Sequence, residues 1–262
     1  MNGPGRARAR AVVGRSTLHV ERLGSGPPVL FVHGSVGGGE STWFAQRPLS
    51  ERWTLLLLDR PGYGSNPPVE REDFEVDAGH VAELLGDGVH VVGQSYVGVV
   101  SLLAAARRPE AVRSLTVIEP PAFAVAAGHP EMDELVARLR GHWEHGPREP
   151  AAFLRAFFEL VGSEIRLPDP LTPSLQRGAE ILLVERGPWK AEIPLDELGR
   201  APFPKLVVSG GHHAAFDGVC DVLEDRLGAE RAVIPGAGHS VQRTGAAFNE
   251  RLEAFLRAAE AA

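Results

Sequence analysis

The hexapeptide GQSYVG, residues 93–98, is the segment of this 262-residue chain with the clearest chemical potential. It follows the apolar run GVHVV and opens a second apolar stretch that is typical of a helix. A serine at a tight turn from a strand into a helix exposes its hydroxyl above the edge of the sheet, where it can attack a carbonyl carbon. Ser95 is therefore the candidate nucleophile, although a serine in this place can also simply cap a helix.

A serine hydroxyl is a weak nucleophile and needs a neighbouring base. His239 lies in the glycine-rich stretch PGAGHSVQ, which we expect to be a loop between the last strand and the last helix. Loops at the carboxyl ends of strands are where functional groups gather in open α/β sheets. A lone loop histidine is usually a solvated side chain, but the order of serine first and histidine last favours His239 as the base.

An acyl-transfer reaction also needs two backbone N–H groups to stabilise the developing oxyanion. We expect one to be the amide of Tyr96, directly after the serine, and the other to be the amide of Ser35 in the stretch HGSVGGG. This glycine run has a competing interpretation as a phosphate-binding loop. It lacks the Lys-Ser/Thr ending of such loops, so the oxyanion interpretation is favoured.

The elements that must position these groups follow from the hydrophobic pattern. Six apolar runs have the length of buried strands: 29–34, 53–59, 88–93, 114–119, 205–210 and 231–236. Helical stretches separate most of them: 74–86, 96–107, 217–227 and 246–258. This alternation predicts an α/β fold with a mainly parallel sheet flanked by helices, preceded by a hairpin over 11–22 that turns at Gly14–Arg15.

Residues 120–204 interrupt the alternation. They contain no good strand but several apolar stripes at helical spacing, and prolines stand at both ends of the segment. We therefore expect an all-helical insertion over 120–204, between a core made of residues 1–119 and 205–262. The aromatic stripe at 153–158 is expected to pack inside this insertion, and the less favoured alternative is that part of it lines the substrate pocket.

Four motifs together resemble the α/β-hydrolase superfamily, in order and spacing, over nearly the whole chain: HGS at 33–35, DRPGYGS at 59–65, GQSYVG at 93–98 and PGAGH at 235–239. The resemblance implies a serine hydrolase that cleaves a carboxylic ester, thioester or lactone through an acyl-enzyme, with 120–204 as a cap domain and no cofactor or metal. Because one fold hosts many chemistries, a carbon–carbon bond hydrolase, a lyase and a non-catalytic small-molecule binder stay open as alternatives.

Two positions depart from the pattern of that family. Val97 stands where the family usually has a small residue, so we expect its β-branched side chain to crowd the turn. The segment GHHAAFDG follows the strand KLVVSG, where the family usually carries the aspartate of its triad. Glu119, at the end of SLTVIE, is the preferred acid, since some family members carry the acid after this earlier strand. Asp217 is the alternative.

Two histidine pairs raise the question of a metal site. His142 and His145 are three residues apart on a predicted helix, but no carboxylate or cysteine set completes them, which favours a solvated face. His212 and His213 are adjacent, so their side chains should diverge. The sequence therefore predicts no metal ligands.

Composition limits the partners and the compartment. The chain has 27 basic and 34 acidic residues, a net charge of −7 that disfavours nucleic acid and anionic membranes as partners. Its one cysteine, Cys220, excludes an internal disulfide, suits a reducing compartment and is expected to be buried and inert. No signal peptide is visible, and the longest weakly polar run, 96–106, is too short to span a bilayer. We expect a cytoplasmic protein that acts on a small, apolar, ester-type molecule; its oligomeric state is left open.

Overall fold

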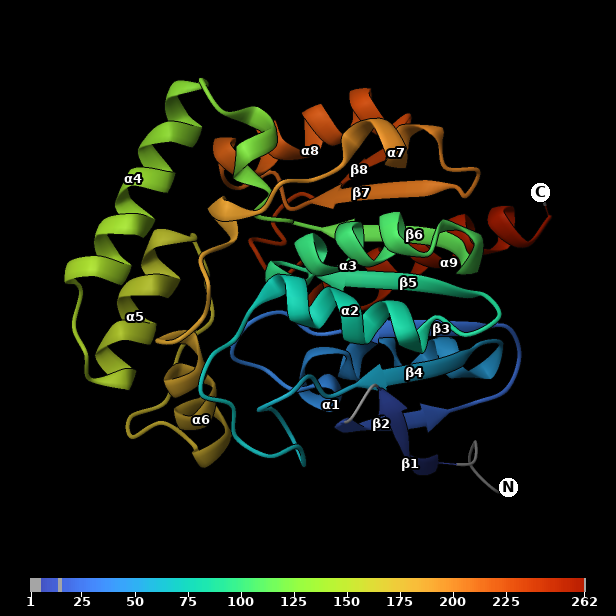
Figure 1. Cartoon of the computed structure of the whole chain (residues 1–262), viewed down its shortest axis with the longest axis horizontal. Coiled ribbons are helices and arrows are strands. Elements are labelled where there is room, and N and C mark those ends of the chain that lie inside the picture. The colour runs from blue at the N-terminus through green and yellow to red at the C-terminus, as the bar shows by residue number, and fades with distance from the viewer. Residues whose placement is uncertain (1–5, 14–15, 262) are drawn as a thin grey trace.

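The computed structural model describes residues 6–13 and 16–261, whose strands form one eight-stranded sheet in the order β1-β2-β4-β3-β5-β6-β7-β8 (Figure 1). The strands are β1 (Arg6–Val13), β2 (Ser16–Leu23), β3 (Pro28–Val32), β4 (Thr54–Leu58), β5 (Val89–Gln94), β6 (Val112–Ile118), β7 (Lys205–Ser209) and β8 (Glu230–Val233). The β1–β2 and β2–β4 pairs are antiparallel, and all the other pairs are parallel. The mainly parallel sheet is thereby confirmed.

Each of the six apolar runs overlaps one of the strands β3 to β8. The runs are apolar because nearly all the side chains of these strands are buried between two layers of helices. β8 is the exception, since it lies at the edge of the sheet and is only partly covered. The expected N-terminal hairpin is formed by β1 and β2. Its turn at Gly14–Arg15 lies outside the described residues.

Helices cover both faces of the sheet. The helices of the chain are α1 (Gly39–Thr42), α2 (Phe74–Leu84), α3 (Tyr96–Arg107), α4 (Pro130–His145), α5 (Pro150–Leu160), α6 (Pro173–Leu182), α7 (Leu195–Arg200), α8 (Ala214–Leu227) and α9 (Ala246–Ala261). α2, α3 and α8 share one hydrophobic core with the sheet, and α9 packs in a second core on the opposite face (Figure 1). α8 begins three residues before the predicted start, because the ring Nδ1 of His213 accepts the Ala215 amide and caps the helix there.

The stretch between β6 and β7 contains the helices α4, α5, α6 and α7. Figure 1 shows α4, α5 and α6 beyond the carboxyl ends of the parallel strands, the edge at which the loops after β3, β5 and β8 also emerge. α7 differs from the other three because it packs against α8 and α3 of the sheet layer. This placement brings α4–α6 to the edge of the sheet where Ser95 and His239 are expected.

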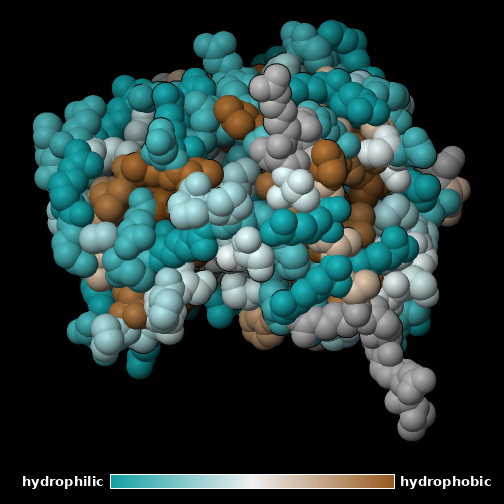
Figure 2. Space-filling model, turned by 60° about the horizontal axis from the view of Figure 1, so that its bottom comes forward, coloured by the Kyte–Doolittle hydropathy of each residue, from teal (hydrophilic) through white to brown (hydrophobic). Residues whose placement is uncertain are grey.

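The surface is largely hydrophilic, with an apolar patch at the end of the molecule that α4–α6 form (Figure 2). A shallow groove at this end includes Val69, Ile181 and Val184. Among the residues that the structure describes, no helix combines the length and the apolar character needed to cross a membrane.

Val97 lies on α3 and is completely buried in the core that α3 shares with α2 and α8. This differs from the expectation that Val97 crowds the turn. The tight contacts are made by the glycines on either side of the turn: a Cβ added to Gly93 would lie 2.2 Å from Ser101 Oγ, and one added to Gly98 would lie 2.7 Å from Pro120 Cβ. Gly93 and Gly98 therefore meet the need for small residues, and Val97 fills the core.

We expect Val97→Gly to lower the free energy of unfolding by about 2–4 kcal/mol, because it removes a buried side chain and adds the helix cost of glycine. Val76→Gly is the matched control, since Val76 lies on α2 with 56% of its surface exposed. It should lose only about 1 kcal/mol. Urea unfolding of both variants checks this, and equal losses would show that Val97 does not contribute to the core as described.

Candidate active site

Ser95 occupies the sharp turn between β5 and α3. Its backbone has φ 55° and ψ −131°, a left-handed conformation that non-glycine residues rarely adopt. The turn is held by the Ser95 amide, which donates to the Ile118 carbonyl at 2.8 Å, and by the Gly98 amide, which donates to the Ser95 carbonyl at 2.6 Å. Strain of this kind persists only where the surroundings fix it, and here it places the serine at the start of α3 above the strand end.

His239 contacts the hydroxyl of Ser95. It lies in the loop between β8 and the 3₁₀ turn at Val241–Thr244, with 7% of its surface exposed. Its Nε2 lies 2.9 Å from Ser95 Oγ, and its Nδ1 lies 3.3 Å from Oε2 of Glu119. The Phe216 ring packs against the imidazole at 4.7 Å between centroids. The three polar side chains thus form one continuous hydrogen-bond chain from carboxylate to hydroxyl.

Glu119 is the residue directly after β6, where the chain also turns with a positive φ of 49°. Its side chain is completely buried, and Oε1 accepts the Gly210 amide at 2.6 Å. Burial alone would raise the pKa of this carboxyl, but hydrogen bonding from His212, His239 and the Gly210 amide lowers it to about 2. Glu119 is therefore a carboxylate at neutral pH, and it lies where the sequence placed the preferred acid.

Asp217, the alternative acid, points elsewhere. It lies in the first turn of α8, where its carboxylate accepts the Ser209 hydroxyl and lies 3.2 Å from Arg231. These partners hold the carboxylate on the β7–β8 side of the helix. The structure thus brings Glu119, and not Asp217, to the imidazole of His239.

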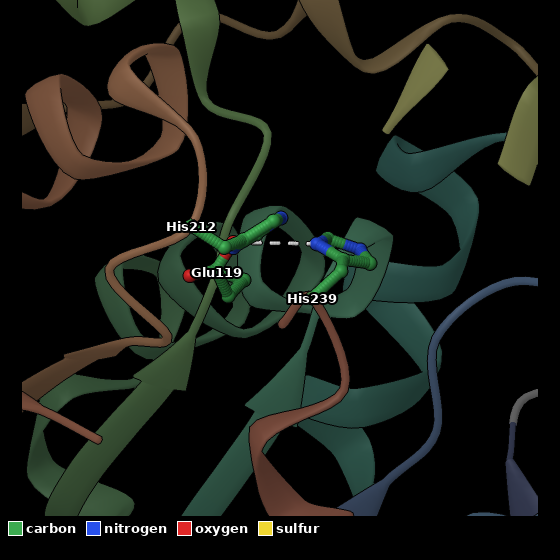
Figure 3. Close-up of side chains that lie close together, drawn as sticks. All are labelled: Glu119, His212 and His239. Carbon is green, nitrogen blue, oxygen red and sulfur yellow. Dashed lines mark hydrogen bonds and ion pairs between the residues drawn. The ribbon is translucent and has the colours of Figure 1, made fainter. Parts of the chain in front are cut away.

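His212 is a further residue of the site that the sequence analysis did not assign to it. Its Nδ1 lies 3.6 Å from Oε2 of Glu119, an ion-pair distance, and its Nε2 contacts the Val161 carbonyl at 3.2 Å. Figure 3 shows Glu119, His212 and His239 converging beside the strand ends. The neighbouring carboxylate raises the pKa of His212. The signal in the sequence was the histidine that stands where the family's usual aspartate is missing.

The same three residues form a group that is able to hold a metal ion. Within the described part of the chain it is the one such group, and its ligand atoms all lie within 4.8 Å of one another. A bound ion would take up His239 Nδ1 and the Glu119 carboxylate, and would so replace the hydrogen bond between them. The side chains of His212 and His213 diverge, as predicted, since His213 turns away to cap α8.

His142 and His145 also differ from each other. His142 is buried, stacks on Phe153 at 4.0 Å between ring centroids and contacts the Phe153 carbonyl through Nε2. The expectation of a solvated face was therefore wrong for His142. The His145 side chain is 82% exposed beside Glu144, as expected. Cys220 is buried with a free thiol, and burial raises its pKa.

Two backbone amides are available beside the serine. Tyr96 directly follows Ser95 at the start of α3, and Ser35 lies on the loop after β3. Neither amide donates a hydrogen bond to any residue that the structure describes. Unpaired N–H groups at a helix N-terminus and a neighbouring loop are the usual donors to a developing oxyanion.

Two cavities meet at Ser95. The wider one has a volume of about 320 Å³ and also reaches His239; its charged side chains are Arg166 and Arg243. The narrower one, about 20 Å³, is enclosed by apolar side chains from the helical insertion, including Leu139 and the aromatic rings of Trp143, Phe157 and Trp189. Phe157 and Phe158 line the wider cavity, so the less favoured alternative holds for this part of the stripe, while Phe153 packs inside the insertion as expected.

Comparison with known proteins supports the same interpretation. The sequence model of the alpha/beta hydrolase family matches residues 29–251. A pimeloyl-(acyl-carrier protein) methyl ester esterase of Methylococcus capsulatus is 36% identical over 182 residues, which cover 63% of this chain and 70% of that protein. A dihydrolipoyllysine-residue acetyltransferase component of an acetoin cleaving system from Pseudomonas putida is 30% identical over 269 positions, covering 97% of this chain and 70% of the relative.

The solved structures agree on the fold. Carboxylesterase CesB of Bacillus subtilis superposes with a TM-score of 0.70 at 20% identity, over 96% of this chain and 92% of the esterase. The family match spans most of the chain, and the sheet order and the turn at Ser95 fit it. The chain belongs to the alpha/beta hydrolase family and is an enzyme that resembles the carboxylic ester hydrolases of that family.

Proposed function

We propose that the protein hydrolyses a carboxylic ester, thioester or lactone through an acyl-enzyme on Ser95. The observation that carries the proposal is the hydrogen-bond chain from Glu119 through His239 to Ser95 Oγ. Three side chains in this order perform acyl transfer on several unrelated folds. The esterase among the relatives supports an ester as the substrate.

The proposed reaction has two halves. Ser95 Oγ attacks the carbonyl carbon while His239 Nε2 takes the hydroxyl proton, and the amides of Ser35 and Tyr96 stabilise the oxyanion. The intermediate collapses, the bond to the leaving group breaks, and His239 returns the proton to the leaving oxygen or sulfur. Water, deprotonated by His239, then releases the carboxylic acid and restores Ser95. Glu119 holds the imidazole in the required tautomer and stabilises its cation throughout.

The two cavities suggest the shape of the substrate. We propose that residues 120–204 act as a cap whose helices close the narrow cavity, which has room for little more than one small apolar group. The remainder of the ester then extends into the wider cavity, towards Arg166 and Arg243. A charged group in the narrow cavity would be desolvated against aromatic rings and is therefore disfavoured.

Replacing the nucleophile is the direct test of the proposed function. We expect Ser95→Ala to lower kcat for a p-nitrophenyl ester by about 10⁴-fold or more, because the attacking oxygen is lost. Circular dichroism and thermal unfolding should show an intact fold. If the variant retains activity within tenfold of the parent, Ser95 is not the nucleophile; turnover of β-diketones without ester cleavage would instead favour a carbon–carbon bond hydrolase.

The identity of the acid is tested by two isosteric substitutions. Glu119→Gln removes the charge that orients His239 and should lower kcat by up to about 10⁴-fold. Asp217→Asn changes a carboxylate that pairs with Arg231 and should leave kcat within a few-fold of the parent. Steady-state kinetics on one ester decides between the two carboxylates. A large loss of kcat in Asp217→Asn, together with an unchanged kcat in Glu119→Gln, would reverse the assignment.

The narrow cavity is tested by enlarging it. Leu139→Ala removes a side chain from its wall and should shift the preferred chain length of the small substituent upwards, by about fourfold in kcat/KM for each added methylene that becomes buried. Leu135→Ala is the control, since Leu135 is equally buried on α4 but does not line the cavity. A series of esters with graded chain lengths provides the measurement. Identical profiles for both variants would contradict the assignment of this cavity.

A further inference from the structure

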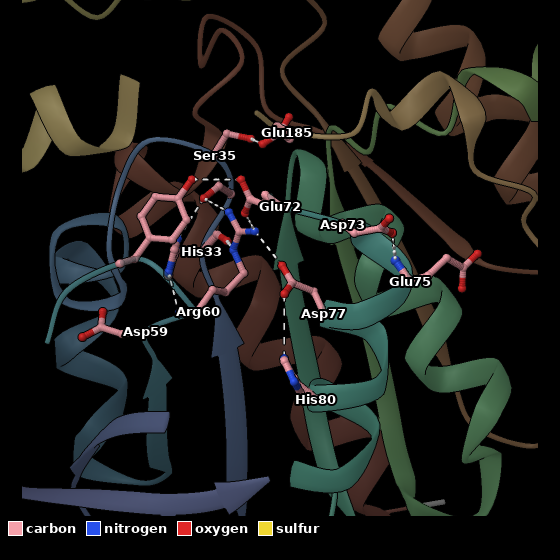
Figure 4. Close-up of polar contacts among 12 residues, drawn as sticks. His33, Ser35, Asp59, Arg60, Glu72, Asp73, Glu75, Asp77, His80 and Glu185 are labelled. Atoms are coloured by element: carbon pink, nitrogen blue, oxygen red, sulfur yellow. Dashed lines mark hydrogen bonds and ion pairs between the residues drawn. The ribbon is translucent and has the colours of Figure 1, made fainter. Parts of the chain in front are cut away.

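A buried carboxyl from the helical insertion contacts the loop that supplies one of the proposed oxyanion donors. Glu185 follows α6 and has 5% of its surface exposed. Ser35 Oγ donates a hydrogen bond to its Oε2 at 2.5 Å (Figure 4). Glu185 also lines the narrow cavity together with Ser95 and Tyr96. A change in the charge of Glu185 is therefore a change in the electrostatic surroundings of the reacting carbonyl.

The backbone around Glu185 is held firmly. The Arg186 amide donates to the Glu72 carbonyl at 2.8 Å, and the Glu72 amide donates to the Val184 carbonyl at 3.3 Å. The indole N–H of Trp143 donates to the Glu185 carbonyl at 3.1 Å. These three bonds tie the segment to the chain before α2 and to α4, so the backbone of Glu185 is held in place.

Glu185 belongs to a buried group with more carboxyls than cations. Arg60, which is 1% exposed, donates to both Glu72 and Asp77, and Figure 4 shows its guanidinium between them. Among the described side chains, Glu185 has the Ser35 hydroxyl as its hydrogen-bond partner and no cation within ion-pair distance. Because an unpaired buried carboxylate is costly, the group favours keeping a proton on a carboxyl that lacks a cation.

The remaining charges around Glu185 come from several elements. The phenols of Tyr63 and Tyr96 lie close enough to interact electrostatically with Glu185. Farther along, His80 lies beside Asp77, and Arg186 pairs with Asp73. On the outer side, the segment borders a surface groove that also includes Arg71, Arg140, Glu144 and Lys190. Burial is the main cause that raises the pKa of Glu185, to about 7, with Asp77 adding to the rise while Ser35 and Arg60 oppose it.

We propose that Glu185 is a positioning residue of the oxyanion site, which holds the Ser35 loop as a neutral carboxylic acid and suppresses turnover when it ionises. The proposal rests on the proposed function. The neutral acid accepts the Ser35 hydroxyl bond without adding charge to the narrow cavity. The carboxylate places a negative charge beside the carbonyl oxygen on which negative charge develops, and so raises the energy of the transition state.

This role predicts two limbs in the pH profile. Activity is low at acid pH because a general base has to be neutral to accept a proton. It falls at higher pH as Glu185 loses its proton, because the active form of the enzyme has neutral His239 and neutral Glu185. The fall should approach about tenfold in kcat/KM per pH unit above the pKa of Glu185 if the ionised form is inactive.

The test compares kcat/KM from about pH 5 to about pH 9 for three proteins at constant ionic strength. The parent should give a bell-shaped profile. Glu185→Gln keeps an oxygen acceptor for Ser35 but cannot ionise, so its profile should rise and then stay level, with the ratio of variant to parent increasing by about tenfold or more towards pH 9. Glu180→Gln is the matched control on α6, where Glu180 is exposed and bonded to Gln176, and it should follow the parent.

The outcomes separate the possible failures. If the profiles of kcat/KM against pH run parallel for the parent and Glu185→Gln, at equal or lower activity, Glu185 makes only a structural contact and the proposed role is overturned. If Glu185→Gln does not fold, Ser35→Ala is the second variant, because it keeps the Ser35 amide and removes the hydroxyl that lowers the pKa of Glu185. The alkaline limb of its profile should then move to higher pH. An unchanged alkaline limb in Ser35→Ala would also overturn the proposed role of Glu185. Full activity in Ser95→Ala would instead contradict the proposed function itself.

Discussion

The arrangement at the sheet edge depends on one buried carboxylate. Glu119 has no exposed surface, yet its low pKa keeps it ionised because the Gly210 amide, His239 and His212 all face it. An isolated charge in such a place would be strongly unfavourable, and its donors therefore have to be fixed. Satisfying this charge fixes the orientation of the His239 ring, and the ring in turn meets Ser95 Oγ.

The parallel sheet explains how these donors reach one point. Ser95 follows β5, Glu119 follows β6, Gly210 follows β7 and His239 follows β8, and these strands are neighbours in the sheet. Because they run in the same direction, their carboxyl ends meet at one edge. The helices α4–α6 lie beyond that edge (Figure 1), and the stretch between β6 and β7 adds polar contacts, from Val161 to His212 and from Glu185 to Ser35.

The sequence predicted the residues whose positions follow from local context. Ser95 and His239 stand in short motifs at strand ends, and Glu119 ends a recognisable strand, so each was placed without tertiary information. Glu185 lies in an insertion without a strand pattern, and its place beside Ser35 comes from pairing with Glu72, more than a hundred residues earlier in the chain.

Other differences have equally physical reasons. The crowding expected at Val97 was a local argument about the turn, whereas the side chain points into a core built by α2, α3 and α8. His142 was expected to be solvated because no carboxylate or cysteine set completes a metal site with His145, but stacking on Phe153 from the next helix buries it. Such contacts join elements whose relative position the sequence does not specify.

The most direct measurement of the central claim is covalent labelling of the parent enzyme with a fluorophosphonate, followed by mass spectrometry of its peptides. A serine activated by His239 and Glu119 should form a single adduct per chain, located on Ser95. An adduct on another residue, or an unlabelled Ser95 in folded protein, would contradict the account of this site.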